Sequence, residues 1–200
     1  MQTPEFFDDV PPITVVDPLA EFLGAAADGR LEYRSVDVVK AAGHSCPTVA
    51  GAWLMTRKAL GLLYPDSLPR RGEIRVELRR ALDDGVAGVV GAVAGLVTGA
   101  ANDGGFQGIG GRFGRQGLLR FGVPMAGDIR FSRLDTGRAV ELALRAHAVP
   151  RPDAIADAMP PPSPDADPAR RRAFAIAWQD WVRTLLLDHA EDPDLIEVTA

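Results

Sequence analysis

Apolar and charged residues alternate along the segment EIRVELRR, positions 73–80. Ile74, Val76 and Leu78 fall on one side of an extended chain, and the charged residues fall on the other. This two-residue period predicts a β-strand with one face in the core and the other in water. Strands are also predicted at residues 118–122 and 128–134, whereas residues 138–146 fit either a strand or a helix.

Helical signals dominate the first third of the chain. Asp17 is followed by Pro18, and Gly29 closes the apolar stretch behind them, which predicts a helix between an N-cap and a glycine stop. The same signals predict a short helix at residues 35–42. A longer apolar helix is predicted from just after Cys46 to about residue 63.

A further helix is predicted in the uncharged stretch from residue 85 to 102. Its glycines recur at steps of three and four residues, so they share one helix face: Gly88, Gly91, Gly95 and Gly99. Such a stripe lets another backbone approach closely, but it lowers helix propensity and therefore needs tertiary packing. Because Gly and Ala make up more than half of the stretch, it indicates a buried helix rather than a membrane span.

The segment ANDGGFQGIGGRFGRQG, residues 101–117, is too rich in glycine for regular structure. It lacks the lysine and hydroxyl residue of a P-loop, and it does not join a strand to a helix as the dinucleotide fingerprint requires. Arg112 and Arg115 are its candidate cofactor-binding residues, because two guanidinium groups can clamp an anion. A solvated loop without a ligand is the simpler interpretation.

Two residues near the start of the long helix carry the candidate chemistry. Pro47 suits the first helical turn, so Cys46 is expected at the N-cap, where unpaired N–H groups and the helix dipole favour a thiolate. His44 lies two residues earlier, and Gly43 permits the chain to bend so that both side chains converge.

This pair is compatible with several kinds of site. Imidazole nitrogen and thiolate sulfur suit a divalent metal, with zinc as the default and Asp103 as the best nearby third ligand. Without metal, Cys46 is a candidate catalytic nucleophile and His44 its base. The Cys-Pro dipeptide also suits haem ligation, although a free cysteine is most often a small core residue.

The composition and net charge of the chain argue against several classes of function. The 200 residues are 46% apolar and 24% charged, with a net charge of −5, which argues against nucleic-acid binding. A single cysteine excludes an internal disulfide and a four-cysteine zinc site. The N-terminal segment MQTPEFFDDVPP lacks the basic and apolar regions of a signal peptide, so a cytoplasmic location and no membrane partner are expected.

The segment AGHSCPTVAGAWLMTRKAL resembles the Gly-His-x-Cys-Pro signature and following helix of the FmdE-like family, which is named after a component of formylmethanofuran dehydrogenase. Residues from LVTGA through FGRQGLLRFG to IRFSRLDTGRAVEL are similar to the later core of that family. The resemblance implies an α+β fold with an antiparallel sheet packed by helices, a homodimer, and a groove near its interface. It also implies that His44 and Cys46 line that groove and bind metal. A small molecule is a further candidate partner.

The chain departs from the family pattern in two places. Family members often carry a second cysteine near the glycine turn, where this chain has residues 99–101, and many add a C-terminal zinc finger. Here a polar, proline-rich linker at 150–168 leads instead to a C-terminal helical extension, 169–200. One face of this extension carries Phe174, Trp178, Trp181 and Leu185. We expect this tail to dock close to the groove, either on its own core, residues 1–149 with an N-terminal arm, or across to the other subunit.

Overall fold

The predicted strand at 73–80 forms β3 (Ile74–Leu78) of a five-stranded sheet in the computed structural model, which describes residues 3–158, 161 and 163–200. The sheet order is β4-β3-β5-β6-β7, and every pair except β3 with β4 is antiparallel. The other strands are β4 (Leu119–Arg120), β5 (Ile129–Arg133), β6 (Ala139–Leu144) and β7 (Ile196–Val198). The ambiguous segment 138–146 is therefore a strand.

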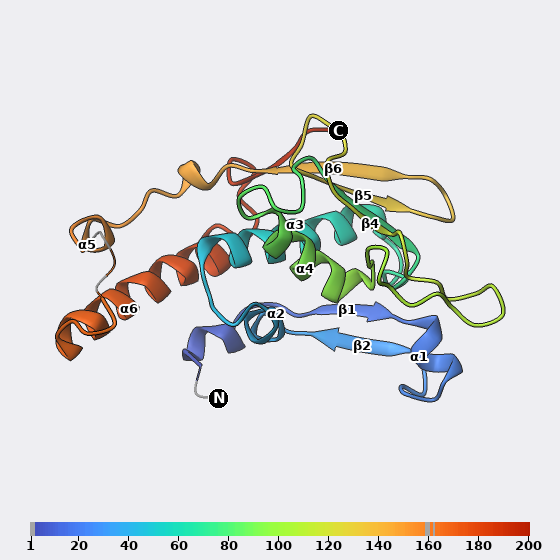
Figure 1. Cartoon of the computed structure of the whole chain (residues 1–200), viewed down its shortest axis with the longest axis horizontal. Helices are drawn as coiled ribbons and strands as arrows, with labels where there is room; N and C mark the ends of the chain where they lie inside the picture. Colours follow the sequence, from blue (N-terminus) through green and yellow to red (C-terminus); the bar gives the residue numbers. More distant parts are fainter. Residues whose placement is uncertain (1–2, 159–160, 162) are drawn as a thin grey trace.

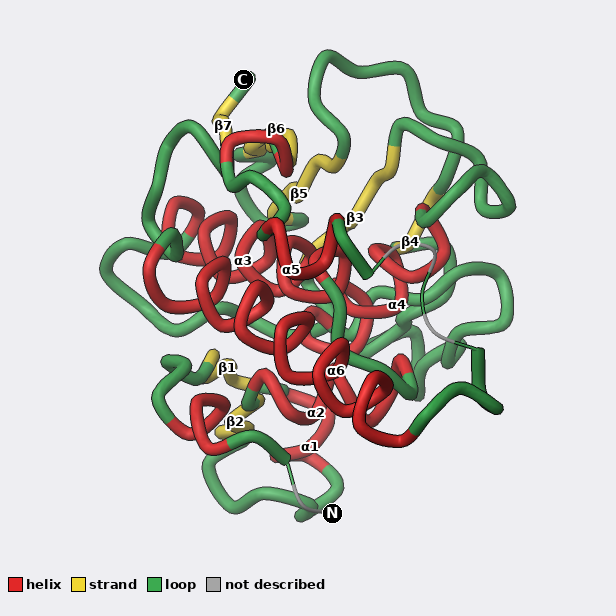
Figure 2. The backbone as a smooth tube through the Cα atoms, turned by 90° about the vertical axis from the view of Figure 1, so that its left-hand side faces the viewer, coloured by secondary structure: helices red, strands yellow, loops and turns green. Residues whose placement is uncertain are grey.

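Helices separate this sheet from a smaller one. An antiparallel pair, β1 (Ile13–Val16) and β2 (Arg30–Tyr33), lies on the opposite side of α3 (Pro47–Leu63) and α4 (Ala87–Thr98), as Figure 1 and Figure 2 show. The remaining α-helices are α1 (Pro18–Phe22), α2 (Ser35–Ala42), α5 (Asp153–Ala156) and α6 (Pro168–Arg183). The predicted α+β class with helices packed on an antiparallel sheet is confirmed.

Helix α3 forms the centre of the core. Its residues Trp53, Leu54 and Leu63 are almost completely buried, because the helix packs against the sheet on one side and against α2, α4 and the C-terminal segment on others. A helix that is apolar around most of its circumference is expected to be buried in this way. Gly51 allows close approach to the sheet, since a Cβ there would lie 2.5 Å from the Leu144 side chain.

The glycine stripe of α4 makes the close contact that the sequence predicts. A Cβ on Gly91 would lie 2.6 Å from the ring of Phe121, and one on Gly95 would lie 2.7 Å from the carbonyl oxygen of Ala100. Both contacts are made within the chain, to the residue after β4 and to the segment just after α4. Gly99, with φ of +75°, ends the helix in the left-handed conformation.

The sheet face opposite the helices is charged but only partly in water. Glu77 of β3 and Glu141 of β6 are both buried, and the Arg130 guanidinium between them pairs with both carboxylates. On the expected solvent face of β3, Glu77 is thus buried by a cross-strand ion pair, whereas Arg79 is exposed.

The predicted helix from Asp17 to Gly29 is shorter than expected. Asp17 caps it as predicted, accepting hydrogen bonds from the N–H groups of Leu19 and Ala20. The helix ends at Phe22 because Gly24 adopts a positive φ of 73°, so that the chain turns back to form β2. The terminating glycine is therefore Gly24, not Gly29.

The C-terminal extension contains more than a helix. After α6 the chain continues through one wider turn, Thr184–Asp188, and then returns to the sheet as β7 beside β6. The linker segment contains α5, whose Ile155 is fully buried. Nowhere in the described ranges is a helix both long enough and apolar enough to cross a bilayer.

Candidate functional site

His44 and Cys46 lie in the short connection between α2 and α3, and local sequence sets its course. Gly43 ends α2 with a left-handed φ of 75°, a conformation that favours glycine, and its N–H donates to the carbonyl of Val39. Cys46 is the extended N-cap residue of α3, and Pro47 occupies the first helical position. The three residues between Gly43 and Pro47 are thus held from both ends.

The two side chains converge as predicted. The Sγ atom of Cys46 lies 3.3 Å from Nε2 of His44, and Nδ1 of His44 lies 3.0 Å from the carbonyl oxygen of Ala42. Because a carbonyl oxygen can only accept, Nδ1 carries the ring proton of the neutral imidazole. The Nε2 lone pair therefore faces the sulfur. His44 is exposed and Cys46 is half-buried, so the pair can be reached from solvent.

The helix N-terminus adds partial positive charge at the sulfur. No side-chain hydrogen bond caps α3, and Pro47 has no N–H. The N–H groups of the next two residues have no partner within the helix, as at every helix start. Peptide dipoles of the 17-residue helix add to this field at the position of the Cys46 side chain.

The C-terminal helix lies on the same loop. The indole N–H of Trp178 donates to the backbone carbonyl of Ser45 over 2.9 Å, and the side-chain amide of Gln179 approaches the same oxygen at 3.5 Å. Trp178 is flanked by the rings of Phe174 and Trp181. The expectation that the tail docks near the candidate site is confirmed, and in this structure it docks on its own core.

Asp103 does not join the pair. It lies in the glycine-rich loop beside a shallow pocket that also includes Leu82 and Phe121. Among the residues that the structure describes, no three His, Cys, Asp or Glu side chains gather closely enough to hold a metal ion. Asp103, the third ligand expected from the sequence, therefore does not form such a group with His44 and Cys46.

Arg112 and Arg115 do not form a joint clamp. Arg112 is exposed, and its guanidinium lies 4.8 Å from the ring centre of Phe113. Arg115 is buried, and its Nη2 donates to Oδ1 of Asp17 over 2.7 Å. The structure thus places one of the two residues on the surface and the other in an interior ion network.

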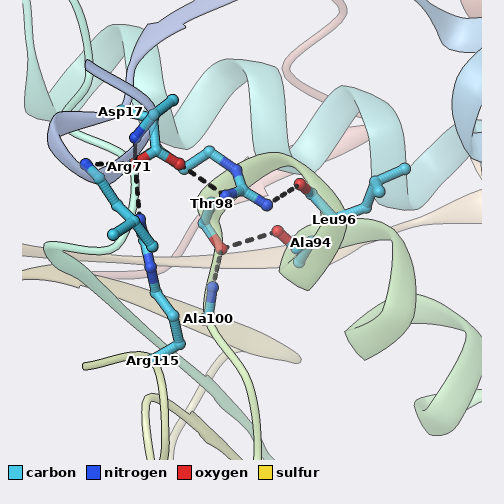
Figure 3. A network of polar contacts seen from close by, with 9 residues as sticks. Asp17, Arg71, Ala94, Leu96, Thr98, Ala100 and Arg115 are labelled. Carbon is cyan, nitrogen blue, oxygen red and sulfur yellow. Dashed lines mark hydrogen bonds and ion pairs between the residues drawn. The ribbon is translucent and has the colours of Figure 1, made fainter. Parts of the chain in front are cut away.

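Asp17 is the centre of that network, which Figure 3 shows. Its second oxygen accepts a 2.7 Å hydrogen bond from Nη1 of Arg71, whose Nη2 donates to the carbonyl of Leu96 near the end of α4. Burial alone would raise the pKa of Asp17, but the Arg71 hydrogen bond, the Arg115 charge and two backbone N–H groups together lower it. The sequence pattern identifies Asp17 only as a helix cap.

An apolar pocket of about 370 Å³ opens between α3, α4 and the sheet. It reaches Thr48, two residues after Cys46, and has Arg80 and Asp128 as its charged lining residues.

No protein-family model, curated protein or solved structure matches the chain at a significant level. The function must therefore be inferred from the geometry of these residues.

Proposed function

We propose that this protein binds a divalent metal ion through Nε2 of His44 and Sγ of Cys46, with zinc as the best-fitting ion. The observation that carries the proposal is the 3.3 Å separation of these two atoms. Typical Zn–N and Zn–S bond lengths at a tetrahedral angle separate the two donor atoms by about 3.5 Å. The corner therefore needs little rearrangement to chelate an ion.

The orientation of the imidazole supports the same proposal. A metal-ligating histidine usually donates its other ring N–H to a carbonyl or carboxylate, which fixes the ring and its tautomer. Here Nδ1 of His44 makes that contact with Ala42, so Nε2 is left free as the ligand atom. The indole N–H of Trp178 holds the intervening Ser45 carbonyl. The two ligands are thus oriented before any ion binds.

Two ligands do not complete a zinc site, which usually has four. We place the remaining donors on a second copy of the chain, on a bound small molecule, or on water. The exposure of His44 supports this arrangement, because another copy can approach the pair. It agrees with the homodimeric groove that the resemblance to the FmdE-like family implies. When bound with an open position, zinc would polarise a ligand carbonyl or activate a water molecule.

The same contact favours a second candidate, a metal-free thiol site. In this alternative His44 Nε2 takes the proton of the Cys46 thiol, and the sulfur adds to a carbonyl carbon of the substrate as the C=O π electrons move onto the oxygen. The Ala42 carbonyl then stabilises the imidazolium through its contact with Nδ1. The N-terminal field of α3 stabilises the thiolate.

Metal titration separates the two candidates. The purified chain is titrated with Zn²⁺ and with Co²⁺, whose thiolate complexes absorb in the near ultraviolet, and bound metal is measured by elemental analysis. We expect the wild type to bind metal stoichiometrically per site. We expect this binding to be lost in His44→Ala and in Cys46→Ser. The control is His147→Ala, which removes an exposed histidine from another part of the chain. If both site variants retain full metal content, the metal proposal is wrong.

Alkylation of Cys46 tests the thiol candidate on metal-free protein. Iodoacetamide should react faster with the wild type than with His44→Ala near neutral pH, whereas His147→Ala should react like the wild type. Equal rates in all three proteins would remove the support for His44 as a base. The metal titration and the alkylation series use different readouts, so either candidate can fail alone.

A further inference from the structure

A separate pocket, of about 220 Å³, lies between α1, the turn before β3, the glycine-rich loop and the end of β5. Its lining is Pro18, Arg71, Gly72, Glu73, Phe113, Gly114, Arg115 and Leu134. None of these residues belongs to the His44–Cys46 corner, so the pocket is independent of the proposed metal site.

The charges at this pocket do not balance. Arg71 and Arg115 both pair with one carboxylate, that of Asp17. The other acid, Glu73, already binds Arg70 through both oxygens, at 2.6 and 2.9 Å. Two guanidinium groups therefore share one negative charge, and one positive charge remains uncompensated at the pocket.

Hydrogen-bond donors are left over as well. The side chain of Arg115 is only 7% exposed, and its Nη1 is buried without a partner, as is Nε of Arg71. Asp17 cannot satisfy them, because it already accepts from both arginines and from two backbone N–H groups. A buried donor without a partner is costly, and a charged one more so.

The pocket wall is shaped around these arginines. Nη1 of Arg115 lies against Gly72, where a Cβ would be only 1.5 Å away, so glycine is required at this position of the pocket lining. Phe113, on another wall, has a φ of +63° and is the one non-glycine residue of the described chain in the left-handed region. Its ring packs between Phe22 and Arg112. Strained backbone of this kind is concentrated at ligand-binding sites.

We propose that this pocket binds a small oxyanion, the carboxylate or phosphate group of a compact organic molecule. A guanidinium presents paired N–H groups that match such oxygens, and binding would supply the missing negative charge. The apolar part of the ligand would contact Pro18, Phe113 and Leu134. The volume is below that of pockets for drug-sized molecules, roughly 300–1,000 Å³, so the ligand is small.

The test uses the full chain with three probes: inorganic phosphate, benzoate, and benzamide as the neutral counterpart of benzoate. Binding is measured by isothermal titration calorimetry and by the shift in melting temperature. The variant is Leu134→Glu, which adds a negative charge at the pocket lining without touching the buried network, because Leu134 is 44% exposed. The control is Leu62→Glu, the same change at a residue on α3 that is 40% exposed and does not line this pocket.

We expect phosphate or benzoate to bind the wild type and Leu62→Glu equally, and Leu134→Glu to bind about tenfold or more weakly. Benzamide should not bind. Binding of phosphate alone identifies a phosphate ligand, and binding of benzoate alone identifies a carboxylate. The proposal is overturned if neither anion binds at millimolar concentration, if benzamide binds as well as benzoate, or if the two variants behave alike.

Discussion

Trp178 and Ser45 are 133 positions apart in the chain, yet the indole N–H of Trp178 donates a 2.9 Å hydrogen bond to the Ser45 carbonyl. Ser45 is the residue between His44 and Cys46. The C-terminal helix therefore does more than cover apolar surface. It fixes the backbone of the loop that sets the distance between the imidazole and the thiol.

Removing this hydrogen bond should loosen the candidate site. Trp178→Phe keeps an aromatic ring but loses the donor, so the Ser45 carbonyl is left without it. We expect a loss of about 0.5–1.5 kcal/mol in unfolding free energy and faster alkylation of Cys46. The matched control is Trp181→Phe, because the indole nitrogen of Trp181 is buried without a partner. If both variants change the alkylation rate equally, Trp178 does not position the loop.

The contact of the glycine stripe can be tested by overpacking. Gly91→Leu forces a side chain into the ring of Phe121 and should cost roughly 1–3 kcal/mol. Gly61→Leu is the control, because a Cβ on Gly61 meets nothing within 4 Å and leucine is the better helix former. Chemical denaturation of the three proteins provides the measurement. Equal stability of Gly91→Leu and wild type would show that α4 can move away from Phe121.

Asp17 should make the protein sensitive to acid. Its pKa is lowered from 3.8 in the folded protein, so its contribution to stability is present above that value and is lost as the pH falls through the folded pKa. At neutral pH, Asp17→Asn leaves the buried Arg115 and the half-buried Arg71 without their carboxylate and should cost about 3–5 kcal/mol. The difference from wild type should shrink below about pH 4.

Urea unfolding between pH 7 and pH 3 measures this effect. Asp66→Asn is the control, because Asp66 is exposed and takes no part in the Arg71 and Arg115 ion pairs. A constant difference between Asp17→Asn and wild type across this range would contradict the ionic role of Asp17.

Local signals explain what could be predicted from the sequence. Gly43 and Pro47 mark the end of one helix and the start of the next within five residues, so the convergence of His44 and Cys46 is visible without tertiary information. The alternation at 73–80 marks β3 in the same way. Glycine also explains an error, because the positive φ of Gly24 ends α1 before the predicted stop at Gly29.

Tertiary partners explain the rest. Asp17 meets Arg71 and Arg115 from 54 and 98 positions away, and no local pattern connects them. In the sequence, the only reason to choose Asp103 as a metal ligand is its place in a polar loop. In the fold, the described residues contain no group of three side chains that could hold a metal ion, so Asp103 belongs to none. The strands β1, β2 and β7 are only three or four residues long, too short for a clear alternation.

The strand β7 makes the C-terminal extension part of the core. Ile196 is 1% exposed, and its carbonyl accepts a 2.7 Å hydrogen bond from Lys58 of α3. Ile196→Ala should therefore cost about 2–5 kcal/mol. Val198→Ala, on the same strand but 47% exposed, should cost much less.

Truncation after Val149 removes this strand together with α6, so it should expose apolar surface and give a protein that aggregates or melts far lower. Calorimetry of the two variants, with sedimentation of the truncated chain, provides the measurement. A truncated chain as stable and as soluble as the wild type would show that residues 150–200 are an independent arm, and the role of Trp178 at the loop would then be dispensable to the core.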